Sequence, residues 1–400
     1  MKKLLLASVA CGALAMATPA SANDHGVKLD LGGHLKGYAV YNDQDEDSTV
    51  NTRDLDILRE TEIHFNGEKT LDNGLTVGVH VEADLDSGDD AKLSGGNEDI
   101  VTEESYVYFS GGWGRVNFGQ EDGAAYLLQV AAPSADSNID GLRQYIQPVN
   151  YQALTDPAEL VGAANTLTGA PFNLTLNSFR FDYDQAVSAY DNKVTYITPV
   201  FSGFQAGISY TPELNDTNEG LGGVSLDDET DAFGDVFDVA ARYEGKFEEL
   251  GFALGAGYTE ASLEEETGST TFSDDRTVWN VGLDMDWGPF GLGVVYKEDD
   301  GGRDAALFED EEIIVVGADY NHGPYKLGAS YYTADNTFAI EDFDTDRYAA
   351  GLTYTYGPGM TFRGSVQYID HDTGSGSGTF ADASDDADAT SILLGTQINF

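Results

Sequence analysis

The stretch Trp279-Asn-Val-Gly-Leu-Asp-Met-Asp-Trp-Gly-Pro-Phe-Gly-Leu-Gly-Val-Val-Tyr296 decides the fold of this chain. Apolar residues occupy every second position before the Gly288-Pro289 pair, and the alternation resumes at Phe290 after it. Successive side chains of a β-strand point to opposite faces of the sheet. The stretch therefore predicts a β-hairpin with one apolar face and one polar or small face.

The same unit repeats along the chain, with two strands, a short turn and a longer polar connection. Seven short turns, counting Gly288-Pro289, would join fourteen strands, and the runs that begin at Val27 and end at Phe400 add one strand each. The sequence thus predicts an all-β chain of sixteen antiparallel strands. The other six turns are expected at Asp72–Gly74, Gly111–Gly114, Phe201–Gly203, Glu248–Gly251, His322–Pro324 and Tyr356–Pro358.

Residues 1–22 have the charged, apolar and small-residue order of a cleaved secretory leader. The apolar core, Leu4 to Ala17, is shorter than a spanning helix requires, which disfavours the alternative of a membrane anchor. We therefore expect a single mature domain of residues 23–400. Cys11 is the only cysteine and lies in the leader, so the mature chain is expected to have no disulfide and no thiolate chemistry.

The charge of the chain is strongly negative. Removal of a leader that carries Lys2, Lys3 and no acid leaves 18 basic residues against 70 acidic ones. This balance argues against nucleic acid as a partner, and a cavity lined by such charge would concentrate cations. The mean hydropathy of −0.30 does not argue against a membrane barrel, because only every second residue of such a strand contacts lipid.

Aromatic residues and acidic connections give the predicted sheet two distinct ends. Aromatic pairs six residues apart span about 20 Å on one strand face, as interfacial anchoring requires, although a soluble sandwich core is the alternative. The long connections are acidic, including Asp342–Asp346, whereas the short turns are not. The pairs are Phe204 and Tyr210, Phe252 and Tyr258, Phe290 and Tyr296, Tyr325 and Tyr331, and Phe362 and Tyr368.

The alternation stops after Gly119 and resumes near Asp191. A structureless loop of that length is improbable in a compact domain unless it has a function or a place to pack. Residues Ala124–Val130 could form a helical turn or two. If the sheet closes into a wide barrel, its lumen is the place where this segment could pack.

Four motifs carry a resemblance to a known family: Ile63–Gly74, Tyr106–Gly119, Asp191–Pro199 and the terminal Gln397–Phe400. With the strand count, they make the chain resemble the general porins of Gram-negative outer membranes, of the sixteen-stranded trimeric type. The resemblance implies a transmembrane antiparallel β-barrel with short periplasmic turns and long extracellular loops. It also implies passive diffusion of small hydrophilic solutes and ions, a homotrimer in outer-membrane lipid and lipopolysaccharide, and a terminal Phe400 read by the assembly machinery.

The resemblance further implies that the third loop, about residues 120–189, folds into the lumen and places acids opposite bases of the wall. Two departures leave its details open, since Gln120 replaces an arginine common in the family and the loop lacks a proline-aromatic-glycine-glycine tip. The candidate loop acids are Glu121, Asp122, Asp136 and Asp140. The candidate wall residues, inward by parity or near the root of the loop, are Lys28, Lys36, His80, Glu82, Arg115 and Arg363.

Other functions were weighed against a cation-preferring channel. An enzyme is not predicted, because the histidines of the mature chain do not lie obviously beside a strand-borne serine. A substrate-specific channel or an adhesive surface barrel stays open, although few aromatics point inward. Calcium is a weaker possibility, since the aspartates near the second long connection match no EF-hand spacing and could instead bridge cations to lipopolysaccharide phosphates. These aspartates are Asp84, Asp86, Asp89 and Asp90.

Overall fold

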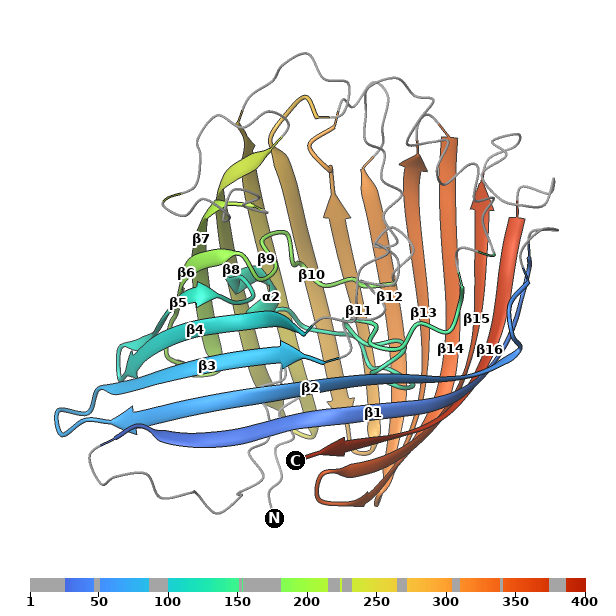
Figure 1. The fold of residues 1–400 in the computed structure, drawn as a ribbon, viewed down its shortest axis with the longest axis horizontal. Helices are drawn as coiled ribbons and strands as arrows, with labels where there is room; N and C mark the ends of the chain where they lie inside the picture. Colours follow the sequence, from blue (N-terminus) through green and yellow to red (C-terminus); the bar gives the residue numbers. More distant parts are fainter. Residues whose placement is uncertain are drawn as a thin grey trace.

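The computed structural model describes residues 26–46, 51–85, 100–150, 153, 181–214, 224, 232–264, 272–303, 310–338, 341–373 and 386–400. Sixteen antiparallel strands among them form one closed barrel (Figure 1). The predicted leader, residues 1–22, lies outside the described residues and stays a prediction. The strands are β1 Lys28–Gln44, β2 Leu55–Thr70, β3 Thr76–Asp84, β4 Val101–Gly111, β5 Gly114–Gln120, β6 Asn192–Ile197, β7 Phe204–Glu213, β8 Phe233–Phe247, β9 Leu250–Leu263, β10 Arg276–Trp287, β11 Phe290–Asp299, β12 Glu311–His322, β13 Tyr325–Phe338, β14 Glu341–Gly357, β15 Met360–Thr373 and β16 Asp386–Asn399.

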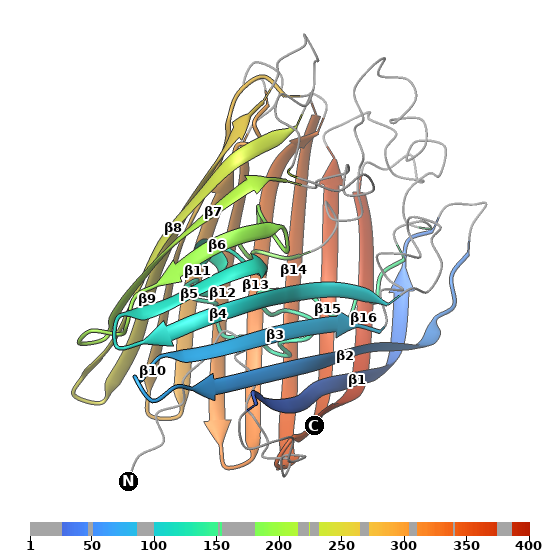
Figure 2. The ribbon, with the colours of Figure 1, turned by 60° about the vertical axis from the view of Figure 1, so that its left-hand side comes forward.

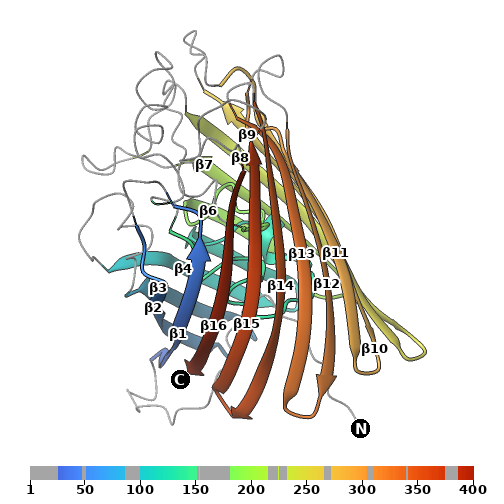
Figure 3. The same cartoon turned by 90° about the vertical axis from the view of Figure 1, so that its right-hand side faces the viewer.

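Each strand pairs with the next one along the chain, and β1 pairs with β16 to close the barrel. The seam ends in two backbone hydrogen bonds, from Gly33 N–H to the Phe400 carbonyl at 3.0 Å and from Phe400 N–H to the Gly33 carbonyl at 3.1 Å. The sixteen-strand prediction is confirmed, and all seven predicted turns lie between successive strands. Figure 3 shows β1 and β16 side by side.

One strand is longer than its sequence suggested. We expected Asp342–Asp346 to belong to an acidic loop, but these residues lie in β14. The pairing of β13 with β14 continues without a break as far as Phe338 opposite Glu341. The prediction was wrong because backbone pairing, rather than side-chain polarity, decides where a strand ends once both of its neighbours are extended.

The predicted alternation places apolar side chains on the outer face of the barrel. In β11, Phe290, Leu292 and Val294 are exposed, while Gly291, Gly293 and Val295 are buried. At the long-loop end, hydroxyls of outward tyrosines donate to nearby carboxylates, as Tyr296 does to Glu298 at 2.7 Å. Such rings have an apolar body and a polar tip, which suits a lipid boundary. Among the described residues, no helix is long and apolar enough to span a bilayer.

The core of the molecule lies inside the barrel. Inward residues of β11 to β16, among them Ile313 and Val315, pack with Phe181 and Tyr183 of the segment between β5 and β6. We expected the inner face to be polar, but these inward positions are apolar. The reason is that these residues contact the segment between β5 and β6 rather than water.

Candidate pore constriction and lumen wall

The segment between β5 and β6 crosses the interior of the barrel. It contains the short helix α2 (Ala124–Leu127), which falls within the stretch predicted to be helical. In Figure 2 this segment lies behind β1 to β4, and its close approaches to inward glycines place it against the inner faces of β7 to β14. The described part of the segment therefore packs along the wall formed by β7 to β14, and it also contacts β1 through Tyr38 and Lys36.

A run of inward glycines accommodates the segment. A Cβ on Gly282 would lie 2.3 Å from the Val130 carbonyl oxygen, and a Cβ on Gly317 would lie 1.8 Å from that of Pro133. Any side chain there would displace the backbone that crosses the wall. We call these residues the glycine track: Gly207 in β7, Gly255 and Gly257 in β9, Gly282 in β10, Gly293 in β11, Gly317 in β12, Gly328 in β13 and Gly351 in β14.

Two of the predicted loop acids attach the end of the segment to the wall. Asp136 is 1% exposed, pairs with Arg363 at 2.6 Å and accepts a hydrogen bond from the Tyr38 hydroxyl at 2.9 Å. Asp140 accepts from the Ser330 hydroxyl at 2.5 Å and from the backbone N–H groups of Ala135 and Asp136 at 2.7 Å. Burial raises the pKa of Asp140 above its ordinary value. Both acids are buried in protein rather than exposed to the lumen.

The other two predicted acids stabilise the root of the segment. Asp122 pairs with Arg143 at 2.6 Å, and Glu121 accepts from the Asn117 side-chain amide at 2.6 Å. Arg143 also donates to Asp184 at 2.5 Å, which ties the two ends of the segment together. Burial raises the pKa of Glu121 and of Asp122 to about 7, although Asn117 and Arg143 oppose the shift.

The four predicted wall bases differ in their surroundings. Arg363 binds Asp136, as above, and Lys36 is buried between Glu60, at 2.7 Å, and the ring of Tyr145, whose centroid lies 3.2 Å from Nζ. Arg115 lies near the short-turn end, with its guanidinium 3.9 Å from the Tyr108 ring centroid. Lys28 begins β1 and is exposed. Lys36 and Arg363 therefore contact the described part of the segment directly, and Arg115 reaches it through Asn117, to which it donates at 2.6 Å and which is the partner of Glu121.

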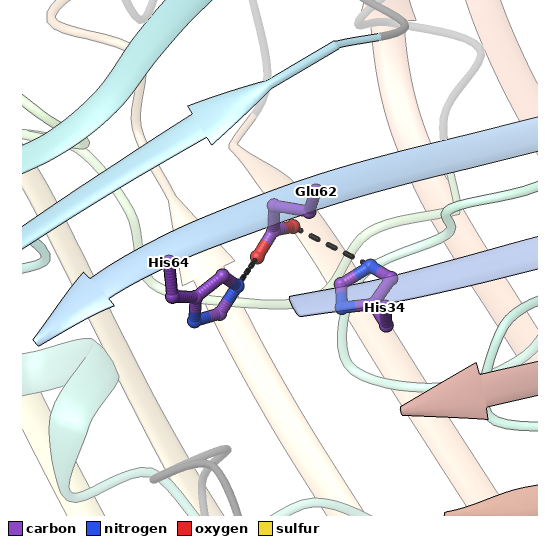
Figure 4. A group of neighbouring side chains, drawn as sticks. All are labelled: His34, Glu62 and His64. Atoms are coloured by element: carbon purple, nitrogen blue, oxygen red, sulfur yellow. Dashed lines mark hydrogen bonds and ion pairs between the residues drawn. The ribbon is translucent and has the colours of Figure 1, made fainter. Parts of the chain in front are cut away.

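His80 and Glu82 belong to a larger arrangement that crosses β1 to β4. Three imidazoles alternate with four carboxylates, and each Nε2 lies between two of the carboxylates. We call this the histidine–glutamate row; Figure 4 shows part of it, His34, Glu62 and His64. In order, the row is Glu60, His34, Glu62, His64, Glu82, His80 and Glu104, with N···O separations of 2.9 Å for Glu60–His34, 3.6 Å for His34–Glu62, 3.5 Å for His64–Glu82, 3.4 Å for Glu82–His80 and 3.3 Å for His80–Glu104.

The strand register places the row. His34 is opposite Glu62, and His64 is opposite Glu82, so inward residues of neighbouring strands meet in pairs. A β-bulge between Val81 and Ala83 then interrupts the pairing of β3 with β4. Two residues on a bulged strand oppose one on its partner. As a result the adjacent Glu103 and Glu104 both reach the row.

Sequence reasoning missed several lumen residues. Glu60, Glu62 and His64 share one parity of β2, so the row had a signal in the sequence, but the bulge that brings in Glu103 had none. Arg347 is completely buried, donates to the Ile139 carbonyl at 3.1 Å and lies over the Phe181 ring at 4.9 Å. Tyr332 and Asp140 also stabilise its charge. Its position depends on the packing of the segment, which no local pattern encodes.

The candidate calcium residues are only partly described. Asp84 ends β3, while Asp86, Asp89 and Asp90 lie outside the described residues. Calcium binding there stays a prediction.

Comparison with known proteins places the chain among bacterial barrels. A family model described as Gram-negative porin matches residues 6–374. The solved anion-selective porin of Comamonas acidovorans is 18% identical with a TM-score of 0.57, and the alignment covers 94% of this chain and all of that one. An in-vitro folded OmpT of Vibrio cholerae, in its trimer form, is 15% identical with the same TM-score and covers 94% and 100% of the two chains.

Curated relatives match over shorter stretches. An uncharacterised protein of Rickettsia felis is 28% identical over 57% of this chain, and one of Rickettsia bellii is 26% identical over 31%. The matched stretch spans about half of the first relative's length and 28% of the second's.

Proposed function

Since the chain belongs to the Gram-negative porin family, we propose that its barrel is a water-filled channel of the outer membrane that passes small hydrophilic solutes and prefers cations. The family and the fold point to a channel rather than to an enzyme.

The cation preference rests on one observation, the carboxylates of the histidine–glutamate row. Glu60, Glu82 and Glu104 keep side-chain exposures of 12 to 15%, whereas Asp136 and Asp140 are about 1% exposed. Charges that contact water can attract ions from it, and a low-dielectric wall focuses their field. The glutamates of the row, which remain accessible to water, are therefore the acids that would favour cations over anions.

The constriction is proposed to lie between the row and the nearest residues of the inner segment. Arg143 is 17% exposed, and the ring centroid of Tyr145 is 6.3 Å from that of His34. An ion that passes here has a guanidinium on one side and carboxylates on the other. Opposed charges of this kind set a transverse field that sorts solutes by charge and dipole.

Reconstitution in planar bilayers tests the function. Purified mature protein should insert in discrete steps of conductance, and under a KCl gradient the reversal potential should have the sign of cation preference. Absence of steps would contradict the channel, and anion preference would contradict the proposed selectivity alone. A heat-denatured sample controls for detergent leaks.

The proposal includes a homotrimer in outer-membrane lipid and lipopolysaccharide, assembled through the strand that ends at Phe400. The trimer form of the Vibrio OmpT supports oligomerisation by analogy. Small outward residues of β1 such as Gly37 and Ala39 would allow a neighbouring subunit to approach closely. Cross-linking in detergent should give a three-chain band, and a monomer at every concentration would contradict the trimer. Deletion of Phe400 should reduce outer-membrane insertion of the exported protein.

A further inference from the structure

The histidine–glutamate row has more acceptors than its histidines can satisfy. A neutral imidazole carries one N–H, and that hydrogen can point at only one carboxylate. Yet the Nε2 atoms of His34, His64 and His80 each face two, at the separations given above. Lys36 pairs with Glu60 at one end of the row only. A cation between the imidazole nitrogens and the carboxylates would satisfy the acceptors that are left over.

The separations suit a metal ion. Zinc binds imidazole nitrogen and carboxylate oxygen at 2.0–2.2 Å in tetrahedral geometry, which sets neighbouring donors about 3.3–3.6 Å apart. The contacts of His34 with Glu62, of His64 with Glu82 and of His80 with Glu82 and Glu104 fall between 3.3 and 3.6 Å. His64 and Glu62 lie closer, in direct hydrogen-bond contact. Donor atoms of His64, His80 and Glu82 all lie within 4.8 Å of one another, and so do those of His34, Glu62 and His64.

One ligand also has an outer partner that fixes its ring. His80 Nδ1 lies 2.6 Å from the Asn66 side-chain oxygen, which can only accept, so Nδ1 donates there, and in the neutral imidazole Nε2 then presents its lone pair to the row. Metal-bound histidines commonly donate their second N–H in this way. The side chains of His64, His80 and Glu82 remain 13 to 21% exposed, which leaves a route for an ion from the lumen.

We propose that the row is a binding site for a divalent transition metal of the zinc class, centred on His64. His64 takes part with either His80 and Glu82 or His34 and Glu62, which gives two histidines and one carboxylate in each case and leaves a fourth position for water or a second glutamate. The nitrogen ligands favour this class over calcium, which prefers an all-oxygen set. The site does not depend on the channel being open or selective.

Metal binding to the purified mature protein in detergent tests the proposal. After treatment with chelator and gel filtration, titration calorimetry with Zn²⁺ at neutral pH should show at least one site per protomer, and Ca²⁺ should not compete for it. His64→Gln should weaken Zn²⁺ binding about 10-fold or more, since a ligand matters at least as much as its outer partners. Co²⁺ should give visible absorption typical of tetrahedral nitrogen and oxygen ligands, and this should fade in the same variant.

His322→Gln is the matched control, because His322 is an exposed histidine at the turn between β12 and β13. It should bind Zn²⁺ as the natural protein does. Failure of the natural protein to bind, equal binding by His64→Gln, or equal competition by Ca²⁺ would overturn the site and leave the histidines as protonated partners of the glutamates. Conductance measured in chelator separates these outcomes from a failure of the channel itself.

Discussion

The inner faces of β1–β4 and of β9–β14 follow the same alternation but differ in the size and charge of their side chains. The second wall has a glycine in each strand and is covered by a segment whose backbone lies on the glycine track. The first has histidines and glutamates that keep contact with the lumen. The difference teaches that the two walls of one barrel can differ in kind, with glycines that leave room for the segment on one wall and charged side chains on the other. Under the proposed function, the segment on the first wall narrows the pore and the charges on the second wall face the ions.

The largest expected effect concerns the ion pair that attaches the inner segment to β15. Arg363→Ala would leave Asp136 buried without its cation, and breaking a buried ion pair costs about 3–5 kcal/mol. We expect the end of the segment to detach, with faster hydrogen exchange of residues 130–140 and a larger conductance. Arg363→Lys, which keeps the positive charge, should give exchange rates and a conductance between those of the natural protein and of Arg363→Ala. Unchanged exchange in Arg363→Ala would show that the pair does not hold the segment.

The next effect concerns the glycine track. Gly317→Ala would place a methyl group against the Pro133 carbonyl, and such overpacking costs about 1–3 kcal/mol. Exchange of residues 128–135 should rise and conductance should increase. Gly357→Ala, where an added Cβ would have nothing within 4 Å, is the control. If the two variants behave alike, the track does not accommodate the segment in the way described.

A smaller effect is expected on the charged wall. Glu82→Gln removes one charge, and at about 7 Å through water one charge changes the energy of a passing ion by about 0.6 kcal/mol, or roughly threefold in local concentration. The cation preference should fall in low salt with chelator present, and screening should hide the change in high salt. Asp72→Asn, in a short turn, should leave the reversal potential unchanged. An equal effect of both variants would assign selectivity to overall charge.

The smallest effect is a pH dependence of the covered wall. Because burial raises the pKa of Glu121 and Asp122 to about 7, the packed segment holds more protons than a released one between about pH 4 and pH 7. Packing should therefore weaken as pH rises through that window and change little above it. Exchange of residues 121–128, corrected for its intrinsic pH dependence, should be slower at pH 5 than at pH 8. The double variant Glu121→Gln and Asp122→Asn should lose this difference.

The sequence revealed the barrel more fully than its interior. Alternation and turn residues such as Gly288-Pro289 are local, so all seven turns could be predicted from them. Asp136 and Arg363 are 227 residues apart in the sequence, and their pairing depends on how the segment packs. The histidine–glutamate row could be predicted only in part. Its histidines share one parity, but the bulge that adds Glu103 has no counterpart in composition.

The seam between β1 and β16 has a consequence for biogenesis. The first strand finds its second partner only when the last strand has been made, because Gly33 and Phe400 lie in the first and last strands of the sheet. Until then two strand edges stand open, and open edges invite pairing with other chains. Contacts so distant in sequence also slow folding. The unclosed polypeptide should therefore need protection from aggregation until the seam forms, and variants that weaken the seam should be degraded rather than accumulate as open sheets.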